Sequence, residues 1–151
     1  MRRLLPIVLL ALVAAGCGGK SSGSARLTHG ELVSEANKVC IDSDHKVYRV
    51  GLLSADPAGW KKTADIADGS VREMAKLRPP AKDAVRFGEL LGYGRDQAAA
   101  LRKLHGALVV KSYTTARAAQ KQATRDDTKV KRAARELGFT FCSQLLTNWP
   151  A

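Results

Sequence analysis

The sequence predicts an all-α protein, an antiparallel four-helix bundle with a C-terminal segment that folds back over it. Three observations favour this fold class. Apolar residues recur at alternating steps of three and four in four separate stretches, which places them on one face of a helix. Segments with proline or glycine separate these stretches, and no stretch alternates apolar and polar residues as a half-buried strand does. Short connections between successive helices favour antiparallel neighbours, and therefore a bundle.

The chain begins with the pattern of a secretory signal peptide, so we assign residues 1–16 to a leader. Arg2 and Arg3 form a positive n-region, an apolar run follows, and small residues precede Cys17. This ending resembles the lipobox of bacterial lipoproteins, in which the cysteine is acylated and becomes the new N-terminus. A permanent membrane span is disfavoured, because Pro6 interrupts a run that is shorter than about 20 residues. We predict lipidation at Cys17, with plain secretion as the alternative.

Residues 17–27 are expected to form a flexible tether between the lipid and a bundle domain of residues 28–151. Glycine, serine, lysine and alanine dominate the tether, without apolar periodicity. The chain carries a formal net charge of +11, and loss of Arg2 and Arg3 with the leader lowers it by two to +9. Anionic phospholipids and anionic envelope polymers would both attract a basic domain at a membrane, and both stay open as partners.

Two cysteines, Cys40 and Cys142, remain once Cys17 is assigned to lipid. An even number of cysteines outside the cytoplasm favours a disulfide. The CxxC-type spacing of zinc sites is missing, which disfavours metal binding by the pair. A bond between them closes a loop of about 100 residues, for which chain entropy gives roughly 4.7 kcal/mol. We therefore predict a disulfide between Cys40 and Cys142.

The first helix is expected to begin at Thr28, because Thr28 and Glu31 have the spacing of a capping box. Gly51 is expected to end this helix. The second helix begins with Asp56 as its N-cap and Pro57 at its first position, where the missing N–H is harmless. The buried face of the first helix is predicted as Val33, Ala36, Cys40, Ser43, Val47 and Val50, and that of the second as Trp60, Ala64, Ala67, Val71 and Met74.

The third helix is expected to open at Pro80. The preceding segment 77–80 ends the second helix, since each proline disfavours the helical conformation of the residue before it. Glycines at 88, 92 and 94 each cost about 1 kcal/mol relative to alanine in a helix interior. We therefore expect a bend or a close helix contact there. The predicted buried face is Ala84, Phe87, Leu90, Leu91, Gly94, Ala98, Leu101, Leu104 and Leu108.

The fourth helix is predicted from near Ser112 to Leu137, with Gly138 as a favourable C-terminal cap. Its inner face consists mainly of small residues, which permit close packing but bury little area. Asp126 falls on this face, so we expect it either half exposed or hydrogen-bonded across the bundle. The members of the inner face are Ala116, Ala119, Ala123, Val130, Ala133 and Leu137.

The tail after Gly138 must fold back over the bundle if the two cysteines pair. In an up-down bundle the end of the fourth helix lies beside the beginning of the first, whereas Cys40 lies about three turns into that first helix. Cys142 can reach Cys40 only if residues 139–142 turn back. The side chains expected to cover the open end of the core are Phe139, Phe141, Leu145, Leu146 and Trp149.

Three short segments resemble the small, mostly uncharacterised secreted lipoproteins of actinobacteria. These segments are Glu35-Ala36-Asn37-Lys38-Val39-Cys40, Leu77-Arg78-Pro79-Pro80, and Leu137-Gly138 before Cys142. The likeness covers roughly residues 28–142. It implies an export signal, a helical bundle and a paired cysteine, and it carries over no catalytic residue.

Patterns for catalysis or cofactor binding are weak, and we predict a non-catalytic protein without a cofactor. The sequence has neither a GxSxG nucleophile elbow nor an HExxH zinc motif. Asp42 and His45 lie one turn apart, and a small metal-handling protein or hydrolase that uses them is the alternative function. Haem ligation by Met74 and His105 is disfavoured, because the CxxCH attachment motif is missing.

A basic stripe on the fourth helix is the predicted binding surface for an anionic partner. Its residues are Arg117, Lys121, Arg125, Lys129 and Arg132, with Lys131 and Arg135 beside them. Like charges four residues apart cost a helix a few tenths of a kcal/mol per pair. The alternative is a solvated face whose charge Asp126, Asp127 and Glu136 partly offset. The expected export and the shortage of stacking aromatics argue against nucleic acid. We predict a membrane-anchored envelope binding or structural module that faces outside the cytoplasm.

Overall fold

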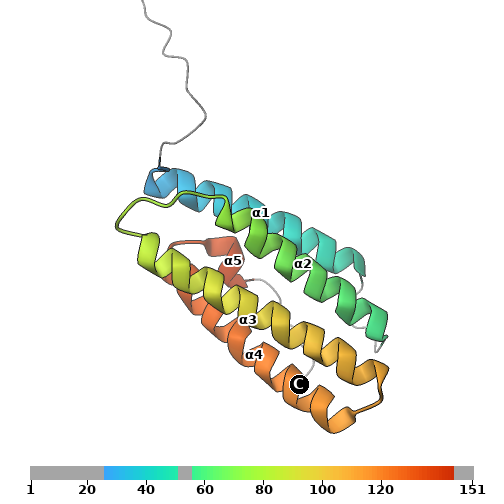
Figure 1. Cartoon of the computed structure of the whole chain (residues 1–151). Helices are drawn as coiled ribbons and strands as arrows, with labels where there is room; N and C mark the ends of the chain where they lie inside the picture. Colours follow the sequence, from blue (N-terminus) through green and yellow to red (C-terminus); the bar gives the residue numbers. More distant parts are fainter. Residues whose placement is uncertain (1–25, 51–55, 145–151) are drawn as a thin grey trace, which may run out of the picture.

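A computed structural model describes residues 26–50 and 56–144 (Figure 1). These residues form four long helices, α1 (His29–Val50), α2 (Pro57–Ala75), α3 (Ala84–Val109) and α4 (Tyr113–Glu136), and the short α5 (Thr140–Gln144). No strand occurs in the described residues, so the predicted all-α bundle is confirmed. None of the described helices combines the length and apolar character needed to cross a membrane. Predictions for Cys17, Gly51, Leu145, Leu146 and Trp149 lie outside the described residues.

Local chemistry fixes most helix ends as predicted. Before α1, the Thr28 N–H donates to Glu31 Oε2 (2.8 Å) and the Glu31 N–H donates to Thr28 Oγ1 (3.3 Å), which completes the capping box. Before α2, Asp56 Oδ1 accepts from the Ala58 N–H (3.0 Å). After α4, Gly138 has a φ of 75°, the left-handed conformation that glycine adopts without strain. The chain therefore leaves α4 sharply and turns back.

The prediction that Pro80 opens the third helix is wrong. Residues 81–83 form a turn in which the Asp83 N–H donates to the Pro80 carbonyl oxygen (3.0 Å), and α3 begins at Ala84. The Asp83 side chain does not cap α3. It lies 2.8 Å from His29 Nδ1 instead, so it links the first turn of α1 to the start of α3.

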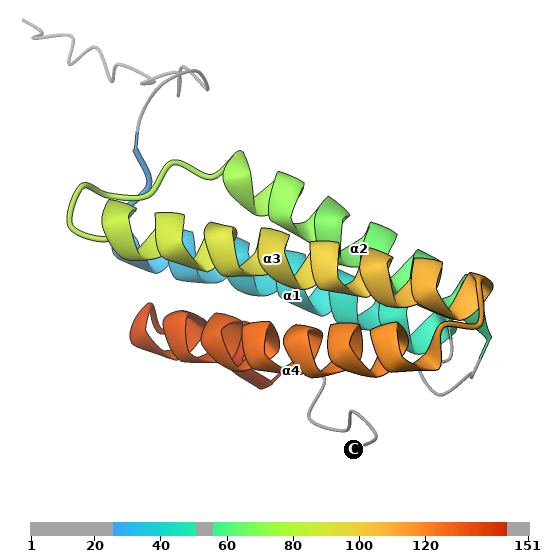
Figure 2. The ribbon, with the colours of Figure 1, turned by 60° about the horizontal axis from the view of Figure 1, so that its bottom comes forward.

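The helices run antiparallel in chain order, but the bundle is not a closed square. α1 packs against α2 and α5, whereas α4 packs against α3 and α5 (Figures 1 and 2). The described parts of α1 and α4 make no close backbone approach to each other. The short α5 therefore joins the two sides of the bundle at one end, and the rest of the seam between α1 and α4 is left open.

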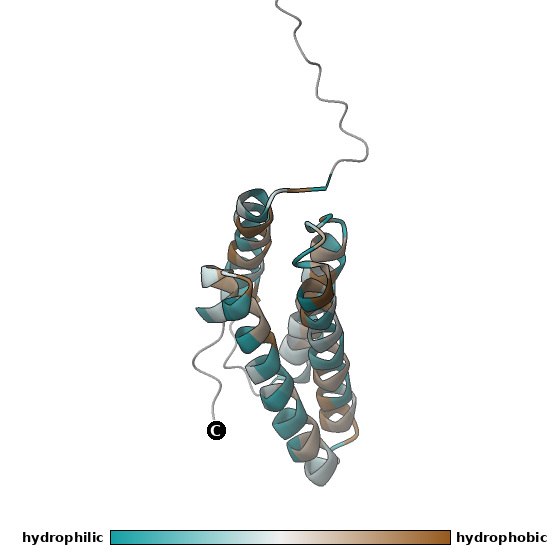
Figure 3. Ribbon diagram, turned by 90° about the vertical axis from the view of Figure 1, so that its left-hand side faces the viewer, coloured by the Kyte–Doolittle hydropathy of each residue, from teal (hydrophilic) through white to brown (hydrophobic). Residues whose placement is uncertain are grey.

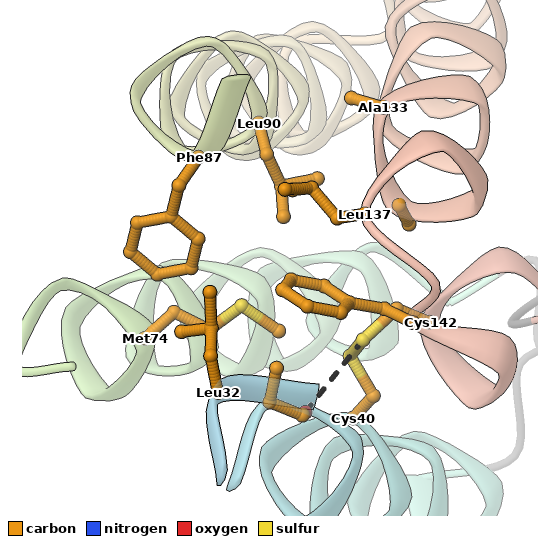
Figure 4. Packing of buried hydrophobic residues seen from close by; sticks show 11 residues of the cluster. Leu32, Cys40, Met74, Phe87, Leu90, Ala133, Leu137 and Cys142 are labelled. Atoms are coloured by element: carbon orange, nitrogen blue, oxygen red, sulfur yellow. Dashed lines mark hydrogen bonds between the residues drawn. A yellow bond between two sulfur atoms is a disulfide. The ribbon is translucent and has the colours of Figure 1, made fainter. Parts of the chain in front are cut away.

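The largest cluster of buried side chains surrounds a disulfide (Figure 4). Cys40 and Cys142 are bonded (S–S 2.10 Å), which confirms the predicted pair. Phe139 is fully buried, and its ring meets that of Phe87 edge-on with 6.3 Å between centroids. Phe141 is 51% exposed, so the prediction that it covers the core is wrong. The other buried members of the cluster are Leu32, Ala36, Met74, Leu90, Ala133, Ala134 and Leu137.

The close helix contact expected at the three glycines of α3 occurs at Gly94. A Cβ atom built there would lie 2.7 Å from Val71 Cγ2 of α2, closer than such atoms can approach. Built at Gly88 or Gly92, it would meet no atom within 4 Å, so the close contact occurs at Gly94 and not at these two positions. Gly94 therefore lets α2 and α3 pack closely.

Candidate functional site

The outer surface of α4 carries a group of cations that we call the cationic face. Its members are Arg117, Lys121, Arg125, Arg132 and Arg135, all of them exposed. No ion pair joins any of them to an acidic group among the described residues. At 100° per residue they lie within an arc of about 80°, and the axial distance from Arg117 to Arg135 is about 27 Å. α4 is also the most hydrophilic of the long helices, as its largely teal ribbon shows (Figure 3).

Both alternatives expected for Asp126 are wrong, because this residue is buried and finds its partners on its own helix. It is 1% exposed, and its carboxylate accepts from Gln122 Nε2 (2.7 Å) and from Lys129 Nζ (3.0 Å). Lys129 Nζ also lies 5.6 Å from the centroid of the Tyr93 ring, within cation–π range. The predicted stripe residue Lys129 is therefore already paired, and we leave it out of the cationic face.

Asp127, one residue further on, makes the contact across the bundle. Its Oδ1 accepts from Gln97 Nε2 of α3 (3.2 Å), and its Oδ2 lies 2.7 Å from Lys131 Nζ. Burial raises the pKa of the Asp127 carboxyl, and the bond to Lys131 offsets part of that shift. Lys131 therefore lies beside the stripe in sequence, but its ammonium group pairs with the buried Asp127.

The acidic residues that were candidates to offset the stripe do so in part, because two of them pair with lysines predicted in the stripe or beside it, and the third pairs with a cation of α3. Asp126 pairs with Lys129, Asp127 with Lys131, and Glu136 Oε2 lies 2.9 Å from Arg86 Nε of α3. In α4 both aspartates are buried, and Glu136 is the only exposed acid. The charge of the cationic face is therefore not offset from within α4.

The turn between α3 and α4 places exposed apolar side chains beside one end of the cationic face. Val109, Val110 and Tyr113 are 57%, 71% and 69% exposed. Lys111 has a φ of 56°, a left-handed conformation that costs a residue other than glycine on the order of 1 kcal/mol. Arg117 lies one helical turn after Tyr113, so the apolar turn and the cationic face form a continuous surface.

Lys103 is a cation near this surface that the sequence analysis missed. It comes from α3 and lines a shallow groove between α3 and α4, together with Arg125 and Gln122. Alanines, among them Ala100 and Ala119, line the rest of the groove. A search for periodicity along one helix cannot find Lys103, because the packing of α3 against α4 brings it to Arg125.

The alternative sites gain no support from the geometry. Asp42 pairs with Lys46 (2.5 Å), and no group of three metal-ligating side chains gathers anywhere in the described residues. Met74 lies in the cluster at the disulfide. His105 Nδ1 instead donates to the carbonyl oxygen of Pro57 (2.8 Å), at the opposite end of α2 from Met74. The structure therefore does not bring the two suggested haem ligands together.

Comparison with known proteins finds no matching family model, no matching curated protein and no matching solved structure. The export leader, lipidation at Cys17 and the resemblance to actinobacterial lipoproteins stay predictions from the sequence. The site is therefore interpreted from its own charges and contacts.

Proposed function

We propose that this protein is an exported, lipid-anchored and non-catalytic binding module that lays the cationic face of α4 against an anionic phospholipid surface. The observation that carries the proposal is the set of five exposed cations without an acidic partner among the described residues. Like charges this close destabilise a helix slightly, and an external anion would relieve that cost.

A phospholipid surface explains the neighbouring apolar turn better than a soluble polymer does. Each lysine or arginine near an anionic leaflet contributes about 1 kcal/mol of attraction. Tyrosine and aliphatic side chains beside such cations gain further stability at the boundary between headgroups and acyl chains. The exposed Val109, Val110 and Tyr113 would gain nothing comparable from a hydrophilic polyanion.

The position of the tether fits a bundle that lies along the membrane. The described chain begins near the start of α1, which the contact between His29 and Asp83 holds beside the start of α3. The apolar turn follows the far end of α3, and 26 helical residues span about 39 Å. With the long side of the bundle facing the membrane, both regions lie at it without an extended tether. α4 forms such a side (Figure 2).

Binding to lipid vesicles tests the proposal. Residues 18–151 lack the acylated cysteine and keep every described contact, so binding would report on the bundle. We expect binding to phosphatidylglycerol vesicles but not to phosphatidylcholine vesicles. Binding should weaken steeply as added salt shortens the Debye length from about 10 Å at 0.1 M.

The double variant Lys121→Glu/Arg125→Glu is expected to bind phosphatidylglycerol no better than phosphatidylcholine, with its helical content unchanged. Equal binding of the unsubstituted protein to both lipids, or binding that ignores salt, would contradict the proposal. Capture by a soluble anionic polymer without capture by vesicles would assign the cationic face to the polymer instead.

A further inference from the structure

A cleft of about 100 Å³ opens between the long helices, beside the disulfide and where α1 and α4 do not meet. Most of its wall is apolar. Met74 of α2, Leu90 of α3 and both bonded cysteines line it near α5, and Figure 4 shows these four side chains converging. Val47 and Leu101 line it further along the bundle. The many alanines of α4 bury little area, so the core is too thin to fill this space.

The polar groups in the cleft wall are satisfied except at one atom. The Thr63 hydroxyl donates to the carbonyl oxygen of Gly59 (3.0 Å). The hydroxyls of Ser43 and Ser70 lie 2.7 Å apart, and that of Ser70 also bonds to a backbone carbonyl of its own helix. Gln97 is the exception.

The carbonyl oxygen of Gln97 has no donor among the described residues. The residue is 9% exposed, and its side-chain Nε2 donates to Asp127 Oδ1 (3.2 Å). That bond fixes which end of the amide carries the oxygen, because a carboxylate can only accept. A buried acceptor without a partner costs about 1–3 kcal/mol, so a donor supplied by a ligand would be favourable there.

The polar groups beside Gln97 carry no net charge, and this excludes an ionic ligand. The carboxylate of Asp127 lies 2.7 Å from the Lys131 ammonium, so the pair has no net charge to offer. An ammonium group or a carboxylate entering the cleft would lose its hydration without gaining a counter-ion. A neutral donor such as a hydroxyl group carries no such penalty.

We propose that this cleft binds a small neutral molecule with an apolar body and one hydroxyl group, which donates to the carbonyl oxygen of Gln97. An engineered apolar cavity of about 150 Å³ binds benzene. A cleft of about 100 Å³ with an open mouth suits a phenol or a short alcohol, whose far end extends toward solvent. The proposal is independent of the cationic face, because the cleft lies inside the bundle.

Titration with phenol and toluene tests the proposal, since toluene carries a methyl group of similar size where phenol carries the hydroxyl group. We expect residues 18–151 to bind phenol with a dissociation constant on the order of 1 mM, and to bind toluene more weakly. NMR shift changes should map to the inner sides of the four long helices that line the cleft, and most strongly to α2 and α3. In Gln97→Met, which keeps the length of the side chain, the preference for phenol over toluene should fall about fivefold, the effect of one ordinary hydrogen bond.

Two further variants keep the test decisive if Gln97→Met folds poorly. Ala67→Leu adds volume to the cleft wall, and we expect it to abolish binding of both molecules. Gln144→Met changes an exposed glutamine of α5 outside the cleft, and its affinities should equal those of the unsubstituted protein. Absence of phenol binding, or equal affinity for phenol and toluene, would overturn the proposal. Binding that survives Ala67→Leu would place the ligand elsewhere.

Discussion

Removing the disulfide is expected to release α1 before the rest of the bundle. Among the described helices, the backbone of α1 approaches only α2 and α5 closely. The disulfide and one hydrogen bond, from the Phe141 N–H to Asn37 Oδ1 (3.1 Å), link α5 to it. The bonded cysteines are 102 residues apart, for which chain entropy gives about 4.7 kcal/mol. A domain typically has about 5–15 kcal/mol of total stability, so this contribution is about a third of it or more.

The double variant Cys40→Ala/Cys142→Ala measures that contribution. Urea denaturation should show a free energy of unfolding lower by about 4 kcal/mol. Hydrogen exchange should show protection lost first in α1 and α5, whereas α3 and α4 keep theirs because they pack along each other. Reduction of the unsubstituted protein should give the same pattern. A loss below about 1 kcal/mol, or an even loss of protection over all helices, would refute this reasoning.

Four further predictions concern single-residue substitutions. Gly88→Ala should stabilise the protein by about 1 kcal/mol, because the position is helical and open. Gly94→Ala should be about 2 kcal/mol less stable than Gly88→Ala, since its Cβ would lie 2.7 Å from Val71 Cγ2. Equal free energies of unfolding of the two variants in urea would contradict the close contact. Burial raises the pKa of Asp127 above 3.8, so the unsubstituted protein should lose stability as pH rises from 3.8 through the raised pKa. Asparagine does not titrate, so the stability of Asp127→Asn relative to the unsubstituted protein should increase over this range. Urea denaturation across this range measures the difference, and a decrease would show that the bond to Lys131 outweighs burial. Lys111→Gly should stabilise by about 0.5–1 kcal/mol by relieving the positive φ, and an unchanged melting temperature would contradict that strain.

The helix ends were predictable because their chemistry is local. Thr28 and Glu31 satisfy each other's orphan groups over three residues, and Asp56 caps α2 through a bond that spans two. Gly138 adopts a conformation that few other residues tolerate. Such signals require no knowledge of the rest of the fold.

Side-chain partners from different helices were not predictable in the same way. Asp126 and Asp127 are neighbours, and both are buried. Asp127 makes the cross-bundle bond because Gln97 of α3 lies opposite it, and the sequence gives no position for α3 relative to α4. Phe139 and Phe141 likewise differ by two residues, but the reversal at Gly138 buries the first and exposes the second.

The candidate site was predictable only in its outline. Four-residue spacing on one helix located most of the cationic face. The loss of Lys129 from it follows from its pair with Asp126 on the same helix, which four-residue spacing does not reveal, and the approach of Lys103 depends on the packing of α3 against α4. The cleft was not predicted, because it results from the missing contact between α1 and α4.

A comparison of two charge reversals on the same vesicles tests the central claim most directly. Lys121 lies in the cationic face, whereas Lys62 is exposed on α2 and has no ion pair among the described residues. Lys121→Glu and Lys62→Glu change the net charge equally. Lys121→Glu changes the charge near the membrane surface by two units, and each unit contributes about 1 kcal/mol, so binding to phosphatidylglycerol should weaken by about 30-fold. Lys62→Glu should weaken this binding by less than about threefold. Equal losses would show that net charge, and not the cationic face of α4, directs binding.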